Sequence, residues 1–244
     1  MERKEYLRRY LILFGLITMQ LSISAQYGTE IYNAYTSGDM NKWEAAVTKT
    51  ESSRPTSLSR RLELLNYYYG YIGYLIGKEE NGKAKSYIAK GEKLIEAILK
   101  EDPDHVEATA YLGSFIAYQM SINRIKTPVL GPKSLRYINK AYKLDPNNLQ
   151  AIVDKANLLF YAPAVFGGDK NQAIPLYQKA IRKMENENLN HQNWYYLNLL
   201  VVLAQHYEKT GEKEKAVHTY QKILKEEPEF EWVKNELYPR VQQR

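Results

Sequence analysis

The sequence predicts an all-α fold in which pairs of antiparallel helices follow one another along the chain. The first observation is self-similarity, because the Tyr-Gln-Lys segment at residues 177–181 recurs with related residues at 220–224. The second is that an acidic residue followed by proline closes three helical stretches, at Pro103, Pro146 and Pro228. Proline cannot continue the helix that it follows. One helix pair cannot bury its apolar face alone, so repeated pairs are expected to stack into a solenoid.

The spacing of small and apolar residues predicts the helices in chain order. Gly38 and Asp39 form the turn inside the first pair. A small residue ten positions after a closing proline lets the two helices of a pair approach closely, and Gly113 and Ala156 occupy that position. Asp169 is expected to cap the helix that follows it. The period predicts five helix pairs and a closing helix, near residues 27–52, 58–101, 104–144, 147–184, 192–226 and 229–241.

Three segments exceed the regular spacing, near residues 125–132, 162–169 and 185–192. The first two each follow the first helix of a pair, so they are expected to project from the same edge of the solenoid. We expect this edge, with Pro128 to Pro132 and with Val165 and Phe166, to form part of a contact surface for a partner.

The C-terminal unit resembles a tetratricopeptide repeat. This resemblance covers most of residues 27–228, strongly after Asp104 and weakly before it. It implies a right-handed α-α superhelix of about five helix pairs with a C-terminal capping helix, with its clearest repeats at 104–144, 147–184 and 192–228. A shorter tract, residues 163–169, is similar to a turn in the helical-repeat components of tripartite (TRAP) uptake systems. The repeat positions of the C-terminal unit are occupied by Leu203, Ala204, Tyr207, Gly211, Ala216, Tyr220 and Pro228.

In tetratricopeptide solenoids the first helix of each pair lines the concave side, so the resemblance implies where a partner would bind. In the second unit Tyr67, Tyr71 and Tyr74 share one helical face, which is either a binding stripe or part of the core. Of the groove positions carried over by register, we expect Ser114, Tyr118, Asn157, Phe160, Tyr161, Asn198 and Gln205 to contact the partner. The other groove positions of the three later units are Glu107, Ala110, Ala117, Gln150, Val153, Val201, Glu208 and Lys209.

Residues 1–25 have the pattern of a secretory signal peptide. Four Lys or Arg residues precede an apolar run at 10–17, which is shorter than the roughly 20 residues that span a bilayer. Cleavage after Ala25 would leave a repeat domain over residues 26–244; an uncleaved membrane anchor is the alternative. Cysteine is absent, so disulfides and thiolate metal sites are excluded. The leader and the lack of cysteine together favour a bacterial periplasm.

Motifs typical of enzymes and metal sites do not occur in the sequence. The four histidines fit no metal-binding spacing, and we expect them on helix surfaces. No nucleophile motif is present. The formal charge is +6, with Lys and Arg alternating with Glu and Asp, which is typical of solvated helix faces. We therefore expect a non-catalytic protein without metal or cofactor, which binds no nucleic acid and does not stay inserted in a membrane after leader removal.

The favoured function is an exported scaffold that binds a protein or peptide partner on its concave face. The alternative is a periplasmic small-molecule-binding component of a TRAP-like uptake system. A closed, tyrosine-lined cavity inside the superhelix would favour the small-molecule alternative, whereas an open groove would favour the scaffold.

Overall fold

The computed structural model describes residues 28–243, so the predicted leader at residues 1–25 lies outside the described residues. The described chain consists of helices joined by short turns, it contains no β-strand, and its first helix covers residues 28–36. The short helical turns are η1 (Arg124–Lys126), η2 (Ala164–Phe166) and a π-helical turn, η3 (Val233–Leu237). The longer helices are α2 (Met40–Ser52), α3 (Leu58–Gly77), α4 (Asn81–Glu101), α5 (Val106–Ile122), α6 (Thr127–Leu144), α7 (Leu149–Tyr161), α8 (Lys170–Asn186), α9 (Trp194–Lys209), α10 (Lys213–Glu226) and α11 (Tyr238–Gln243).

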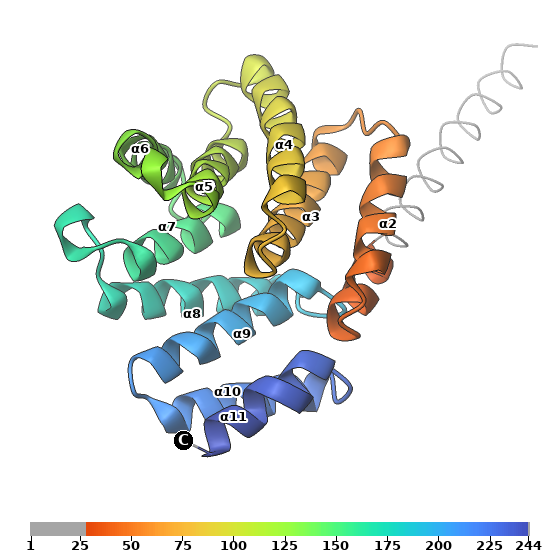
Figure 1. The fold of residues 1–244 in the computed structure, drawn as a ribbon, viewed down its shortest axis with the longest axis vertical. Coiled ribbons are helices and arrows are strands. Elements are labelled where there is room, and N and C mark those ends of the chain that lie inside the picture. Colours follow the sequence, from red (N-terminus) through yellow and green to blue (C-terminus); the bar gives the residue numbers. More distant parts are fainter. Residues whose placement is uncertain (1–27, 244) are drawn as a thin grey trace, which may run out of the picture.

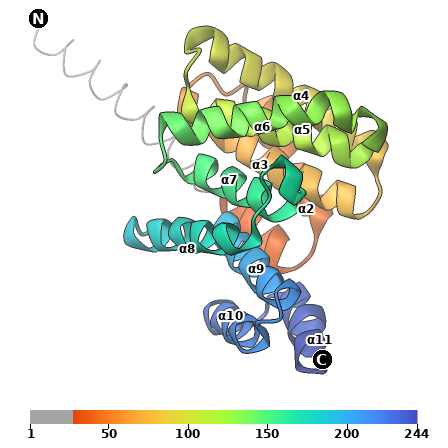
Figure 2. The same cartoon turned by 90° about the vertical axis from the view of Figure 1, so that its left-hand side faces the viewer.

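Consecutive helices pack as pairs, which confirms the predicted all-α solenoid. The closest pairs are α3 with α4, α5 with α6, α7 with α8 and α9 with α10. The first helix of each pair also packs on the pair before it: α5 contacts α3 and α4, α7 contacts α5 and α6, and α9 contacts α8. Figure 1 shows the pairs following one another in a curved row, and Figure 2 shows α6 on the outer side of this row.

Polar caps and glycine turns set the helix boundaries. Asn148, Asp169 and Asn193 each accept hydrogen bonds from backbone N–H groups in the first turn of α7, α8 and α9. Such caps satisfy donors that have no partner inside the helix. The predicted cap at Asp169 is thus confirmed. Gly38 and Gly211 have φ values of 69° and 81° in the turns after the first helix and after α9, a conformation that favours glycine.

The predicted insertions take different forms in the structure. The first is helical, since η1 leads directly into α6, which contains Pro128 in its first turn and Pro132 farther along. Proline is tolerated in a first turn because the N–H group there needs no partner inside the helix. The second insertion contains η2, which ends at Gly167 with a φ of 85°. Both lie between the first and second helices of a pair.

The two ends of the described chain meet across the curve of the solenoid. The hydroxyl of Tyr32 donates to Glu227 at 2.6 Å, and that of Tyr35 donates to Asn198 at 3.1 Å. The rings of Trp43 and Trp194 lie 4.8 Å apart, edge to face. In Figure 1, α2 accordingly approaches the start of α9, although some 150 residues separate them. The superhelix is therefore wound tightly enough for its first pair to pack on its last.

Close packing between α4 and α5 depends on Gly91. A Cβ atom added there would lie 2.0 Å from Cε2 of Phe115, which is fully buried. We expect Gly91→Ala to lower the free energy of unfolding by about 1–3 kcal/mol, because one ring or helix must move. Gly82, also in α4, has open space at the same atom, so Gly82→Ala serves as the control and should be neutral or slightly stabilising. Urea unfolding of both variants checks this, and equal midpoints would contradict it.

Candidate functional site

The inner curve of the solenoid is filled by its own aromatic side chains. The ring of Tyr69 on α3 lies 5.9 Å from Tyr111, 5.5 Å from Tyr118 and 6.1 Å from Tyr195, which come from α5 and α9. Aromatic pairs at these separations attract one another beyond the burial of their area. The tyrosines of the inner curve therefore pack against each other across successive repeats and do not leave an open groove between them.

Polar side chains form a buried network among these rings. Asn157 donates to the hydroxyl of Tyr69 at 3.0 Å and accepts from the hydroxyl of Tyr177. The hydroxyl of Tyr195 donates to Gln150 at 2.8 Å, and Gln150 Nε2 donates to Asp154 Oδ1 at 2.9 Å. The network thus links helices α3, α7, α8 and α9, and fixes the tyrosines in position.

Asp154 is the carboxyl group at the centre of this network. Its side chain is fully buried, and its second oxygen, Oδ2, has no hydrogen-bond partner among the described residues. Burial raises the pKa of Asp154 to about 7, and hydrogen bonds from Ser114, Gln150 and Asn157 oppose this rise. No cation among the described residues offsets the burial, so a large fraction of this carboxyl stays protonated near neutral pH, whereas an ordinary Asp is almost fully ionised there.

A cleft of about 500 Å³ lies beside this network, at the N-terminal halves of α3, α5, α7 and α9. Its walls combine aliphatic side chains with tyrosine rings, amides and two carboxylates. The cleft is open to solvent, so it offers a partner apolar contact together with a few polar groups that can orient what binds. The cleft is lined by Leu58, Ser59, Leu62, Glu63, Asn66, Glu107, Tyr111, Leu149, Gln150 and Tyr195.

The two carboxylates of the cleft differ in their surroundings. Glu63 forms an ion pair with Arg60 at 2.6 Å and accepts a hydrogen bond from Tyr67 at 2.6 Å. Glu107 forms no hydrogen bond or ion pair with the described residues, and burial raises its pKa to about 7. A cationic group that entered the cleft would find Glu107 available as an acceptor.

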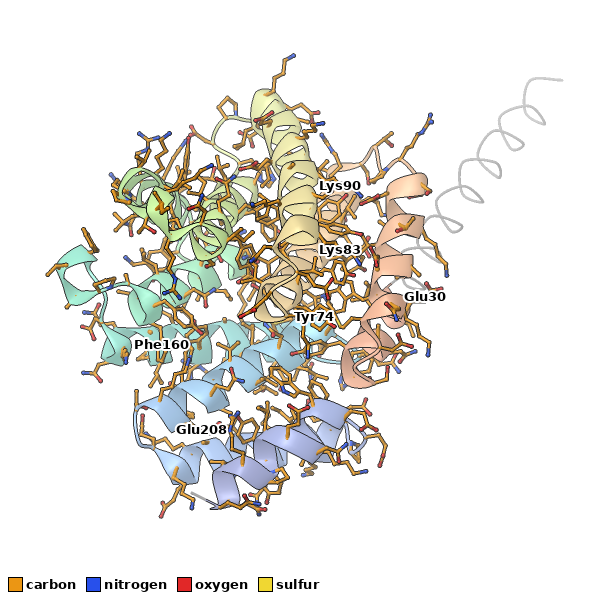
Figure 3. All side chains as sticks on the ribbon, viewed as in Figure 1. Glu30, Tyr74, Lys83, Lys90, Phe160 and Glu208 are labelled. Atoms are coloured by element: carbon orange, nitrogen blue, oxygen red, sulfur yellow. The ribbon has the colours of Figure 1, made fainter. Side chains whose placement is uncertain are left out.

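The tyrosines of the second unit lie in different environments. Tyr67 and Tyr71 are buried, while Tyr74 is half-buried. The Tyr67 hydroxyl points to Glu63 at the cleft, whereas the ring of Tyr71 lies 5.4 Å from the Lys83 ammonium. Lys83 belongs to α4, the second helix of the same pair, and Figure 3 shows it in the seam between α4 and α2. Tyr71 therefore faces α4.

The predicted groove residues of the third and fourth units lie mostly in the packed interior. Ser114 and Phe160 are buried, and Tyr118 is half-buried with its hydroxyl donating to the carbonyl oxygen of Tyr69 at 3.2 Å. Asn157 is engaged in the network described above. Tyr161 is 61% exposed and lies at the end of α7.

The remaining predicted residues lie outside the cleft. Asn198 accepts the hydrogen bond from Tyr35, and Gln205 lines a shallow cavity of about 300 Å³ near the C-terminal end of α9. Val165 and Phe166 are 85% and 63% exposed on η2. The cleft residues Glu107 and Gln150 belong to the predicted groove, whereas Leu58, Leu62 and Tyr195 were not predicted.

The expectation that all four histidines lie on helix surfaces was wrong for His206. This residue is fully buried, and its ring stacks on Phe160 at 3.3 Å with an angle of 3° between the planes. Neither ring nitrogen has a hydrogen-bond partner among the described residues, and burial lowers its pKa to about 3. His206 therefore packs in the core as a neutral, planar side chain. The helical periodicity of the sequence was not enough to predict that this position is buried.

Within residues 28–243, no group of three or more His, Asp or Glu side chains is placed to hold a metal ion. None of the helices described there is both long enough and apolar enough to cross a bilayer.

Comparison with known proteins connects this geometry to a family. A family model described as tetratricopeptide repeat matches residues 197–230, the unit in which the repeat residues are most complete. A solved structure of a thermophilic TPR protein from Thermus thermophilus is similar over 91% of this chain and 98% of its own, with a TM-score of 0.57 and 13% identity. The MamA protein matches over 73% of this chain and 88% of its own, with a TM-score of 0.39 and 19% identity. No curated protein sequence matches. The chain therefore contains a tetratricopeptide repeat at residues 197–230 and has the fold of a tetratricopeptide-repeat solenoid.

Proposed function

We propose that this chain is an exported, non-catalytic scaffold that binds a segment of a protein partner in the cleft at the N-terminal halves of α3, α5, α7 and α9. The tetratricopeptide-repeat fold itself supports a role in protein–protein interaction. The proposal that the partner binds in the cleft rests on the composition of the cleft, because four successive inner helices contribute to one surface that is partly apolar and partly acidic. The predicted leader at residues 1–25 supports export, with the periplasm as the proposed compartment.

The chemistry of the cleft favours a segment with an aliphatic side chain beside a Lys or Arg. Leu58, Leu62 and Leu149 supply an apolar wall, and Leu58 remains 40% exposed. Burying such side chains contributes about 25 cal/mol per Å² of apolar area. Glu107, which has no cation partner within the described residues, would accept a hydrogen bond from the incoming cation.

The alternative, a small-molecule component of an uptake system, lacks this support. A closed, tyrosine-lined cavity would favour it, but the tyrosines of the inner curve pack on one another and leave neither such a cavity nor an open groove between them. The support for the scaffold comes instead from the cleft, which has aliphatic and acidic walls. The similar proteins reported above carry no indication of an uptake system. We therefore retain the scaffold alone.

Peptide selection against the purified protein tests this proposal. Peptides displayed on phage would be selected on the native chain and depleted on Leu62→Asp, which places a charge in the apolar wall. We expect the enriched peptides to carry Lys or Arg next to an aliphatic residue. Glu107→Gln should weaken their binding by about tenfold, because it removes a charge-assisted hydrogen bond. Isothermal titration calorimetry measures the change.

The matched control for this experiment is Glu236→Gln, which makes the same chemical change at an exposed position remote from the cleft. It should leave peptide affinity unchanged. Peptides that bind Leu62→Asp and the native chain equally would refute the cleft as the binding site. Selection of acidic peptides would refute the proposed chemistry of the partner.

A further inference from the structure

The outer helix α6 and the turn before it carry an unusual charge distribution. From residue 108 to residue 144 the chain contains no Asp or Glu, while Arg124, Lys126, Lys133, Arg136, Lys140 and Lys143 all lie in this stretch. Lys133, Arg136, Lys140 and Lys143 are spaced by three or four residues and are exposed, so they share one face of α6. The alternation of opposite charges expected along the helices therefore fails at α6.

Most of this positive charge is not neutralised by neighbouring helices. Lys140 pairs with Asp104 at 2.8 Å near the C-terminal half of α6. Arg124, Lys126, Lys133, Arg136 and Lys143 form no ion pair within the part of the chain that the structure describes. The unpaired charge thus extends along α6 to the η1 end.

The same end of α6 presents apolar side chains to solvent. Ile125 is 90% exposed and Val129 is 64% exposed. On the next repeat, Val165 and Phe166 of η2 are 85% and 63% exposed. The η1 and η2 turns lie at the same edge of the solenoid, because each follows the C-terminal end of an inner helix and those helices, α5 and α7, pack side by side. In Figure 1 the turn between α7 and α8 projects from the body of the molecule.

We propose that this edge, made of η1, the exposed face of α6 and η2, binds an anionic lipid surface. The headgroup region of a bilayer deforms around inserted groups, so it can cover the apolar side chains of both projections at once. Arg124 and Lys126 of η1 lie beside these apolar residues, and the cations of α6 continue the positive charge from Lys133 along the helix, so the edge attracts anionic headgroups. Arg and Lys can keep their charge at the headgroups while their alkyl stems contact the apolar layer. This edge is distinct from the cleft, so it can act while a partner occupies that site.

Binding of the full-length chain to lipid vesicles tests the proposal. The vesicles are phosphatidylcholine alone or phosphatidylcholine mixed with phosphatidylglycerol, and the readout is the ratio of the two partition coefficients in a flotation assay. Using this ratio cancels any charge-independent contribution of the N-terminal apolar run. We expect the native chain to prefer anionic vesicles, and Lys133→Glu with Arg136→Glu to reduce the ratio by about tenfold or more. Added salt should reduce the preference of the native chain.

The control changes the same charges on another outer helix. Lys85 and Lys93 of α4 are exposed and form no ion pair with the described residues, so Lys85→Glu with Lys93→Glu should keep most of the anionic preference. An equal loss in the α4 and α6 variants would refute the proposal, because net charge alone would then explain binding. Circular dichroism checks that each variant is folded, which the exposure of all four positions favours.

The apolar residues provide an independent test of the lipid assignment. Ile125→Ser with Val129→Ser leaves all six cations in place, and we expect it to lower binding to anionic vesicles by about tenfold. Unchanged vesicle binding in this variant would refute insertion of the edge into lipid. Binding of an acidic polymer such as polyaspartate through α6, without any binding to anionic vesicles, would replace the lipid with an acidic macromolecule and also refute the proposal.

Discussion

Replacing Trp194 with alanine is expected to lower the free energy of unfolding by about 3–5 kcal/mol, as for other large buried side chains. Trp194 is only 5% exposed and joins the first repeats to the last. Its ring lies 4.8 Å from Trp43 and 5.9 Å from Tyr35, and its Nε1 donates to Asn66 Oδ1 at 2.9 Å. The substitution therefore removes the ring contacts across the curve and a hydrogen bond to α3 at once.

Gly70 lets the backbone of α3 approach the indole ring of Trp194 closely, so removal of the ring leaves a cavity against this helix. An added Cβ at Gly70 would lie 2.6 Å from Cη2 of Trp194, which indicates that the helix and the indole are in direct contact. Trp194→Phe should have a smaller effect than alanine, because it keeps an aromatic ring but leaves Asn66 Oδ1 without this donor. Urea unfolding followed by circular dichroism ranks the two variants.

Trp232→Ala is the matched control for this prediction, since Trp232 is 36% exposed and lies just before η3. We expect it to cost less than about 1 kcal/mol, as is usual for exposed side chains. An equal loss of stability in Trp194→Ala and Trp232→Ala would contradict this prediction, because the contact between the first and last repeats would then stabilise the fold no more than an exposed side chain does. The packing of the first helix pair on the last would then not contribute measurably to the free energy of unfolding.

The sequence was sufficient to predict the helix pairs and their order because these depend on local signals. Asp169 caps a helix wherever the chain lies in space, and Gly211 permits the turn that follows α9. The contact between Trp43 and Trp194 is different, because it depends on how far the superhelix winds over five repeats. That pitch is the sum of small rotations at each interface, and no single motif encodes it.

The candidate site was predicted only in part for the same reason. Among the groove positions that the repeat register names, Glu107 and Gln150 line the cleft. It did not predict that Tyr69, which lies between Tyr68 and Gly70 in a helix rich in tyrosine, would fill the inner curve. Helical periodicity shows which residues share one face of a helix, but it does not show which other helix packs against that face. The basic face of α6 corresponds to a stretch of sequence without acidic residues. The net charge of the whole chain did not reveal this local excess of positive charge.

The buried carboxyl of Asp154 should make the stability of the protein depend on pH. Its pKa is about 7 in the folded chain, against an ordinary value of 3.8. As the pH rises from about 4 to about 7, the unfolded chain releases this proton before the folded chain does, so the folded state is progressively disfavoured. The contribution of Asp154 to stability is therefore complete below about pH 4 and is lost as the pH rises through about 7. A shift of this size corresponds to at most roughly 4 kcal/mol.

Asp154→Asn isolates this contribution because it keeps an acceptor for Gln150 Nε2 and cannot ionise. We expect the variant to match the native protein within about 1 kcal/mol at pH 4 and to exceed its stability by about 2–4 kcal/mol at pH 8. The groups that face Asp154 are Glu107 on α5 and the tyrosines at 69, 111, 118, 177 and 195, and none of these supplies a positive charge.

Urea unfolding at several pH values, with Glu236→Gln as the exposed control, provides the measurement. Glu107→Gln should also flatten the pH profile, because burial raises the pKa of Glu107 to about 7 as well and its charge adds to the cost of ionising Asp154. If Asp154→Asn were instead less stable than the native chain at pH 8, the ionised carboxylate would be an essential acceptor in the network. The tyrosines of the inner curve would then be held by a negative charge and not by a neutral acid.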